Sequence, residues 1–274
     1  MISARQLAKR YGSNTVLQGI DFEAAAGEFV VILGQSGAGK STLLRCMNRL
    51  LVADGGELHI DGIDAMRCRD PRLLRRKVAM IFQHHHVVPR LTALKNVLTG
   101  RLGSTSVLGS CLHLYRRHDI ALAHECLARV GLAHKAHERT DALSGGQMQR
   151  VGIARALAQQ PRVILADEPV ASLDPRTART VLQYLRDASR ELGITVVCNL
   201  HQVDYAREFG DRIVGLARGR VVFDDDAQAL TDADIDRIYE QPAQAPAKAE
   251  TNSATEATMS IVTSAVIAAK PAAR

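Results

Sequence analysis

A glycine-rich turn near the start of the chain runs Gly34-Gln35-Ser36-Gly37-Ala38-Gly39-Lys40-Ser41-Thr42. It fits the phosphate-binding pattern of a glycine, any four residues, and then Gly-Lys-Ser/Thr. The apolar run Phe29–Leu33 before it predicts a buried strand, and a helical pattern begins at Leu43 after it. In this context the backbone N–H groups of the turn and the helix N-terminus converge on one spot. The turn therefore predicts a nucleoside triphosphate site, with Lys40 on the β- and γ-phosphates and Ser41 on Mg²⁺.

The composition limits the classes of protein to consider. The chain has 274 residues, 46% of them hydrophobic and 23% charged, which is usual for a soluble globular protein. Its net charge of +6 permits a nucleic acid, an anionic membrane surface or phosphorylated ligands as partners. The basic residues are spread along the chain, so we expect no nucleic acid. No apolar run approaches the roughly 20 residues of a membrane span, and the N-terminus does not resemble a signal peptide. We expect a cytosolic protein that reaches a membrane only through a partner.

Cysteines and histidines give no metal or disulfide signal. The five cysteines contain no Cys-x-x-Cys pair, which favours reduced thiols. Three adjacent histidines, His84-His85-His86, point in different directions and have no ligand partners beside them. We expect no metal site at these histidines.

Three further apolar runs predict buried strands, and polar residues follow each of them. The runs are Val78–Phe82 before Gln83, Val163–Ala166 before Asp167 and Glu168, and Thr195–Leu200 before His201. Strands that alternate with helices such as Pro175–Leu192 indicate a parallel sheet, whose ligand sites gather at the carboxyl ends of the strands. We therefore expect these polar residues beside the phosphate loop. Asp167 is expected to hold Mg²⁺ through water, and Glu168 to accept a proton from the attacking water.

The remaining segments surround this core. Residues 3–31 predict strands joined by turns, and residues 92–137 are mostly helical, with a Gly/Ser-rich break near 100–110. Leu143-Ser144-Gly145-Gly146-Gln147 opens a long helix. From about residue 241 the composition shifts to Ala, Pro, Thr and Ser, which predicts a disordered tail over 241–274.

The start of the long helix is a second anion-binding candidate. Ser144, Gly145 and Gly146 offer backbone donors, a hydroxyl group and the positive end of the helix dipole. One chain then carries two phosphate-binding surfaces. Two chains packed head to tail would place each Ser-Gly-Gly turn against the nucleotide of the other.

These motifs together resemble the ATP-binding cassette (ABC) ATPases over roughly residues 3–240. They occur in the order of that family: Tyr11, the phosphate loop, Gln83, Leu143–Gln147, Asp167-Glu168, Ser172-Leu173-Asp174 and His201. The resemblance implies an α/β P-loop (RecA-like) fold with a mostly parallel sheet. It also implies an N-terminal antiparallel β subdomain and an inserted α-helical signature subdomain at about 84–158, within one domain over 1–240.

The resemblance also assigns roles to residues. It implies that Tyr11 stacks on adenine and that residues Gly34 to Thr42 hold the phosphates. Gln83 would touch Mg²⁺ and the attacking water and sense the membrane partner. Ser144, Gly145, Gly146 and Gln147 would clamp the γ-phosphate bound by the opposite subunit. Asp174 would form part of the dimer contact, Glu168 would be the general base, and His201 would steady the γ-phosphate.

Within the family, three stretches resemble the ATP-binding subunits of phosphonate importers. They are Arg90–Gly103, Asp167–Pro175 and Asn199–Arg207. The sequence departs from the pattern at His84-His85-His86, at Asp224-Asp225-Asp226, where an Asp-Gly turn is usual, and in the tail.

We therefore expect an ATPase that works as a homodimer, peripheral on the cytoplasmic face of the inner membrane. Its expected partners are permease subunits and, through them, an extracytoplasmic substrate-binding protein; its cofactors are ATP and Mg²⁺, and its cargo is a phosphonate. Import of polar amino acids or another small anion is the alternative within this class. A soluble ABC ATPase without a membrane partner is a different class, although such proteins usually carry two cassettes or a long coiled-coil insertion. A P-loop kinase would leave the Leu-Ser-Gly-Gly-Gln turn unexplained.

Overall fold

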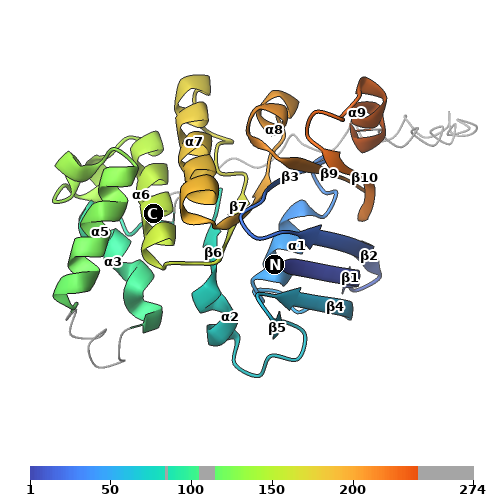
Figure 1. The fold of residues 1–274 in the computed structure, drawn as a ribbon, viewed down its shortest axis with the longest axis horizontal. Helices are drawn as coiled ribbons and strands as arrows, with labels where there is room; N and C mark the ends of the chain where they lie inside the picture. Colours follow the sequence, from blue (N-terminus) through green and yellow to red (C-terminus); the bar gives the residue numbers. More distant parts are fainter. Residues whose placement is uncertain (84–85, 105–114, 240–274) are drawn as a thin grey trace, which may run out of the picture. The chain divides into compact units, whose positions relative to one another are not determined.

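A six-stranded, mostly parallel sheet forms the centre of the computed structural model, which describes residues 1–83, 86–104 and 115–239 (Figure 1). Its strands are, in spatial order, β10 (Arg220–Asp226), β9 (Arg212–Ala217), β3 (Phe29–Leu33), β8 (Thr195–Asn199), β7 (Val163–Asp167) and β6 (Val78–Ile81). The five strands from β9 to β6 run parallel, and β10 pairs with β9 antiparallel. The carboxyl ends of β3, β8, β7 and β6 therefore share one edge of the sheet.

A second, antiparallel sheet is built by the N-terminal residues and a later hairpin. Its strands are β2 (Asn14–Ala24), β1 (Ile2–Tyr11), β4 (Gly55–Ile60) and β5 (Ile63–Asp64), in that order. Helix α1 (Lys40–Met47) packs with this sheet in one apolar core, which also contains Val30 and Ile32 of β3. The alternate residues of β3, Phe29, Val31 and Leu33, belong to the core on the other face. Burial on both faces explains why β3 is apolar at every position.

Helices cover the other face of the large sheet and form an insertion between β6 and β7. The covering helices are α7 (Pro175–Leu192), α8 (Val203–Phe209) and α9 (Asp232–Tyr239), and α2 (Pro71–Lys77) precedes β6. The insertion contains α3 (Ala93–Leu98), η1 (Thr99–Ser104), α5 (Arg117–Arg129), η2 (Ala133–Lys135), η3 (Thr140–Ala142) and α6 (Gly145–Ala158). In Figure 1 α3, α5 and α6 lie together beside the sheet. Throughout the described residues, every helix is too short or too polar to cross a bilayer.

Local sequence explains the longest helix. Asp174 caps α7 and Pro175 occupies its first turn, where the missing N–H of proline costs nothing. Gly193 ends the helix in a left-handed conformation with φ of 64°. Between these ends Ala178, Val181, Leu182, Leu185 and Ala188 recur at helical spacing and are buried.

The structure differs from the sequence expectations at a few boundaries. Helix α1 begins at Lys40 rather than Leu43, because Gly39, with φ of 106°, completes the turn and Lys40, Ser41 and Thr42 form the first helical turn. Asp167 is the last residue of β7 rather than the residue after it. Residues Asp224–Asp226 end strand β10. His84, His85 and the predicted tail over 241–274 lie outside the described residues.

The cysteines within the described ranges are free thiols, as expected: Cys46, Cys68, Cys126 and Cys198. Burial raises the pKa of Cys46 and of Cys126 to about 11. Both therefore stay protonated at neutral pH and are poor nucleophiles.

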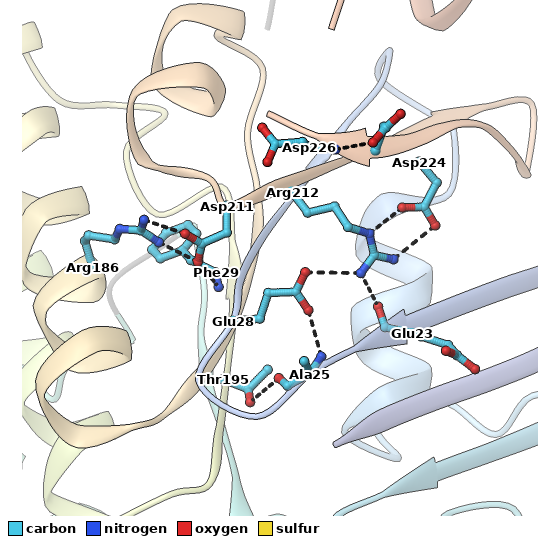
Figure 2. A network of polar contacts seen from close by, with 11 residues as sticks. Glu23, Ala25, Glu28, Phe29, Arg186, Thr195, Asp211, Arg212, Asp224 and Asp226 are labelled. Carbon is cyan, nitrogen blue, oxygen red and sulfur yellow. Dashed lines mark hydrogen bonds and ion pairs between the residues drawn. The ribbon is translucent and has the colours of Figure 1, made fainter. Parts of the chain in front are cut away.

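Two arginines tie the segments around β3 together (Figure 2). Arg212 of β9 binds Asp224 of β10, and it also donates to Glu28 Oε1 at 3.2 Å and to the carbonyl oxygen of Glu23 at 3.0 Å. One guanidinium thus joins β9 and β10 to the end of β2. Arg186 of α7 forms a bidentate pair with Asp211, whose Oδ2 also accepts the Phe29 N–H at 2.9 Å. The start of β3, the strand that leads into the phosphate loop, is held in this way.

The Arg186–Asp211 pair should make stability depend on pH. Burial alone would raise the pKa of Asp211, but hydrogen bonds from Arg186 and Phe29 outweigh it and hold that pKa below its usual value. An Asp in an unfolded chain has a pKa of about 4. The stabilisation from ionised Asp211 is thus fully present above that pH, and it is lost as the pH falls through the lower pKa of Asp211 in the folded protein. Arg186→Leu should lower the free energy of unfolding at pH 7 by about 1–2 kcal/mol, between the effects on exposed and buried pairs.

Urea denaturation at pH 7 and at pH 3.5 measures this effect. The difference in free energy of unfolding between the wild type and Arg186→Leu should be smaller at the lower pH. Arg179→Leu is the matched control on the same helix, because Arg179 pairs with Glu208 where both side chains are exposed, so little stability should be lost. A deficit for Arg186→Leu that is equal at both pH values would contradict the assignment.

Candidate active site

The phosphate loop joins β3 to α1 through three glycines with left-handed or unusual backbone angles. Gly34, Gly37 and Gly39 have φ of 156°, 83° and 106°. A Cβ atom on Gly34 would lie 2.3 Å from the carbonyl oxygen of Leu216, so only glycine fits there. No side chain caps the N-terminus of α1, which leaves its first N–H groups facing the loop. Backbone N–H groups at a helix start of this kind commonly bind anions, so the geometry is compatible with the predicted phosphate site, which stays a prediction.

Lys40 lies under this loop. Its side chain is 4% exposed, and Nζ donates to the carbonyl oxygens of Gly34 at 2.7 Å and Gln35 at 3.2 Å. Burial lowers the pKa of Lys40, and the charges of Glu168 and Asp167 oppose that shift. The positive charge of the Lys40 ammonium group is therefore close enough to both predicted carboxylates to interact with them.

Asp167 connects three elements through one oxygen atom. It ends β7, is 6% exposed, and its Oδ1 accepts a hydrogen bond from Ser41 Oγ at 2.7 Å. The same oxygen accepts Asn199 Nδ2 at 2.8 Å. Ser41 belongs to the first turn of α1 and Asn199 ends β8, so the carboxylate joins the phosphate loop to two strand ends. The predicted proximity of Ser41 and Asp167 is present in the structure.

Glu168 and His201 form a second polar pair at the same edge. His201 Nε2 lies 2.6 Å from Glu168 Oε1, and both side chains are partly buried. Glu168 has φ of 51°, a left-handed conformation that non-glycine residues seldom adopt and that concentrates at functional sites. The pair presents a carboxylate with a fixed hydrogen-bond partner beside Asp167.

Gln83 and Tyr11 were also predicted to belong to the site. Ile81 of β6 pairs with Ala166 of β7, so Gln83 reaches the level of Glu168 along the neighbouring chain segment, with an exposed side chain. Tyr11 ends β1, is 48% exposed, and has the ammonium group of Lys9 5.6 Å from its ring centroid. Neither residue has a contact with Asp167, Glu168 or the phosphate loop among the interactions of the described residues.

The Ser144–Gln147 turn begins α6 as a capping box. Ser144 Oγ accepts the Gln147 N–H at 3.3 Å, and Gln147 Oε1 accepts the Ser144 N–H at 2.9 Å. We expected bare backbone donors here. Two of them instead bind within the turn, and the N–H groups of Gly145 and Gly146 remain outside the box.

Asp174 has a role within its own chain. Its carboxylate accepts the backbone N–H groups of Arg176 at 3.1 Å and Thr177 at 3.0 Å and caps α7. Hydrogen bonds from Thr177 and Arg176 hold the pKa of Asp174 below its usual value. The exposed position of Asp174 is compatible with the predicted dimer contact, which stays a prediction.

Sequence reasoning missed two residues of the site, Asn199 and Tyr239. We treated Asn199 as part of an apolar strand, although an amide within such a run is itself a signal because burying it is costly. Tyr239 of α9 donates its hydroxyl to the carbonyl oxygen of His201 at 3.0 Å. Burial raises the pKa of Tyr239, and a backbone hydrogen bond from Gly34 opposes that shift. No local sequence pattern predicts this contact, because the two residues are far apart in the chain.

Similar proteins identify the family to which this site belongs. Residues 17–171 match the family model described as ABC transporter. The chain belongs to this family. A phosphonates import ATP-binding protein of Thiobacillus denitrificans is 52% identical over 88% of this chain and 93% of its own length. A phosphite import ATP-binding protein of Stutzerimonas stutzeri is 54% identical over 86% of this chain and 88% of its own length.

Solved structures agree with this assignment. The ATP-binding cassette MJ0796, solved as a dimer in a post-hydrolysis state bound to ADP and Pi, is 34% identical with a TM-score of 0.71. That similarity covers 84% of this chain and all of the cassette. The predicted ABC ATPase assignment and the predicted fold class are therefore confirmed.

The contact between α6 and α7 makes a direct test of the signature turn. A Cβ atom on Gly146 would lie 2.6 Å from Thr177 Cγ2. Thr is stiff at χ1, so Gly146→Ala should destabilise the protein by about 1–3 kcal/mol, as overpacking does. Thr177→Ser removes the methyl group but keeps a hydroxyl near Asp174. In that background Gly146→Ala should cost less than about 0.5 kcal/mol, because the clash is gone. Thermal unfolding of the four proteins would refute the contact if both backgrounds lost equal stability.

Proposed function

We propose that this chain is the ATP-hydrolysing subunit of an ABC importer that takes up phosphonates. One observation carries the ATP-hydrolysing part of the proposal. Lys40 and Ser41 of the phosphate loop meet Asp167 and the Glu168–His201 pair at one edge of a parallel sheet. This arrangement provides anion binding, a carboxylate beside a hydroxyl, and a positioned base, which phosphoryl transfer to water needs.

ATP is held by the loop residues Gly34 to Thr42. Their backbone N–H groups and the uncapped start of α1 bind the phosphates, and Lys40 leaves its carbonyl partners to reach the β- and γ-phosphates. The exposed ring of Tyr11 stacks on adenine.

The residues around Asp167 fit Mg²⁺. Ser41 Oγ and the Asp167 carboxylate are oxygen donors whose nearest atoms lie 2.7 Å apart, and Mg²⁺ prefers one or two such ligands with waters and phosphate oxygens. Gln83, two residues beyond the end of the adjacent strand β6, would complete this set. When bound, Mg²⁺ neutralises charge on the phosphates.

Hydrolysis uses Glu168 as the general base. The carboxylate accepts a proton from water that attacks the γ-phosphate in line. His201 orients Glu168 through the 2.6 Å contact and then steadies the γ-phosphate. The strained backbone of Glu168 fixes the direction of its side chain.

The working unit is a homodimer bound to permease subunits on the cytoplasmic face of the inner membrane. Ser144, Gly145, Gly146 and Gln147 of one chain face the γ-phosphate of the other, and Asp174 lies at the same contact. The insertion at about 84–158, within a domain over 1–240, docks on the permease. An extracytoplasmic binding protein delivers the substrate, and nucleic acid has no role.

The substrate class rests on relatives. Those at 44–54% identity include proteins named for import of phosphonates, phosphite and hypophosphite, all of which are oxyanions of phosphorus. Phosphite import is the second candidate, since the relative named for it is 54% identical. None of these names favours a polar amino acid.

Glu168→Gln should retain ATP binding while hydrolysis falls about 10²–10⁴-fold, because a positioned base contributes that much. Glu191→Gln is the matched control, since Glu191 lies on α7 with a largely exposed side chain that pairs with Arg129. The control should hydrolyse ATP within twofold of the wild-type rate. Near-normal turnover by Glu168→Gln would exclude Glu168 as the base.

Uptake distinguishes the substrates. Cells that lack this chain are supplied with the wild-type chain or with Glu168→Gln, and labelled methylphosphonate, phosphite and glutamine are offered separately. We expect methylphosphonate uptake only with the wild-type chain. If only phosphite or only glutamine were taken up, that compound and not a phosphonate would be the cargo.

A further inference from the structure

Asn199 is a buried amide at the centre of the active-site edge. It is 0% exposed and ends β8, which lies between β3 and β7. In the sheet register Asn199 pairs with Ile32 on one side and with Asp167 on the other. The residue therefore stands between the strand that leads into the phosphate loop and the strand that carries the carboxylates.

The amide fixes one oxygen of Asp167. Asn199 Nδ2 and Ser41 Oγ both donate to Oδ1, at 2.8 Å and 2.7 Å. The amino group must face the carboxylate, because the amide oxygen would repel it. Two donors on Oδ1 hold the plane of the carboxylate, and within the described residues Oδ2 accepts no hydrogen bond. Oδ2 is thus the oxygen that remains for another ligand.

The other atom of the same amide is an unused acceptor. Asn199 Oδ1 is buried, and no atom of residues 1–83, 86–104 or 115–239 donates a hydrogen bond to it. Leaving such an atom unpaired costs about 1–3 kcal/mol. The neighbouring strand residues Val196, Val197 and Cys198 are apolar and buried, so an aliphatic side chain would serve the sheet without that cost. The amide of Asn199 is therefore better explained by a role in the active site than by packing in the core.

We propose that Asn199 is a positioning residue that orients Asp167 for Mg²⁺. Its amino group holds Oδ1 against Ser41, which would leave Oδ2 to hold the cation through water, and its amide oxygen would accept a hydrogen bond from a water molecule of the same site. The inference rests on the proposed function, in which Asp167 and Ser41 hold Mg²⁺. Groups that orient metal ligands in this way typically change metal affinity 10–100-fold when they are removed.

The test measures how Mg²⁺ tightens nucleotide binding, independently of hydrolysis. A fluorescent non-hydrolysable ATP analogue is titrated onto the full chain in EDTA and at a series of Mg²⁺ concentrations. Asn199→Leu keeps the approximate size of the side chain and removes both polar atoms. We expect the Mg²⁺ concentration for half-maximal tightening to rise about 10–100-fold, with unchanged affinity in EDTA. Asn199→Val, which also removes both polar atoms and suits a buried strand, should act in the same way and carries the test if the Leu variant does not fold.

Thr195→Val is the matched control. Thr195 is fully buried at the other end of β8, and its hydroxyl binds Gly27 and Ala25 at 3.0 and 2.9 Å. This variant also loses buried hydrogen bonds from the same strand, so it should lower the melting temperature but leave the Mg²⁺ dependence within twofold of wild type.

The outcomes separate the two claims. A Mg²⁺ requirement in Asn199→Leu within twofold of wild type, or an equal loss of affinity with Mg²⁺ and in EDTA, would overturn the role of Asn199 and leave the proposed function in place. No effect of Mg²⁺ on the wild-type chain would overturn the proposed metal site, and this inference with it.

Discussion

The hydrogen bond from Ser41 to Asp167 is the constraint on which the rest of the site depends. β3 and β7 are not neighbours, because β8 lies between them. The first turn of α1 must therefore cross the end of β8 for Ser41 to reach Asp167 at 2.7 Å. That crossing requires the abrupt turn at Gly39, the burial of Lys40 under the loop and a side chain on β8 that tolerates a buried carboxylate. Asn199 meets the last requirement by donating to Asp167.

Much of this arrangement could be predicted because its signals are local. The spacing of Gly34, Gly39 and Lys40 predicts the loop, and apolar runs that end in Asp167 or His201 predict strand ends at one edge. Both helix starts near Ser144 and Pro175 were predicted, but the capping roles of the side chains there were not. Ser144 with Gln147 three residues later is a capping-box pattern, and Asp174 before Pro175 is a helix start. The roles of Asn199 and Tyr239 depend on register and on contacts between segments far apart in sequence, which no local pattern contains.

The surfaces proposed to meet a second chain are already rigid within one chain. The capping box fixes the Ser144 turn, Asp174 fixes the start of α7, and the close approach of Gly146 to Thr177 joins the two helices. A rigid surface loses little conformational entropy when it binds, so most of its binding energy remains for the γ-phosphate. The hydrogen bond from the Tyr239 hydroxyl to the carbonyl oxygen of His201 connects α9 to the active site in a similar way.

In the proposed function a complete site needs two chains, the phosphate loop of one and the Ser144 turn of the other. Sedimentation velocity of the Glu168→Gln chain with Mg²⁺-ATP tests it most directly, because ATP then persists. We expect a monomer without nucleotide, a dimer with ATP, and a monomer under both conditions when Ser144→Arg is added to a chain that keeps its circular dichroism spectrum. A dimer that forms with ATP despite Ser144→Arg would contradict the shared site.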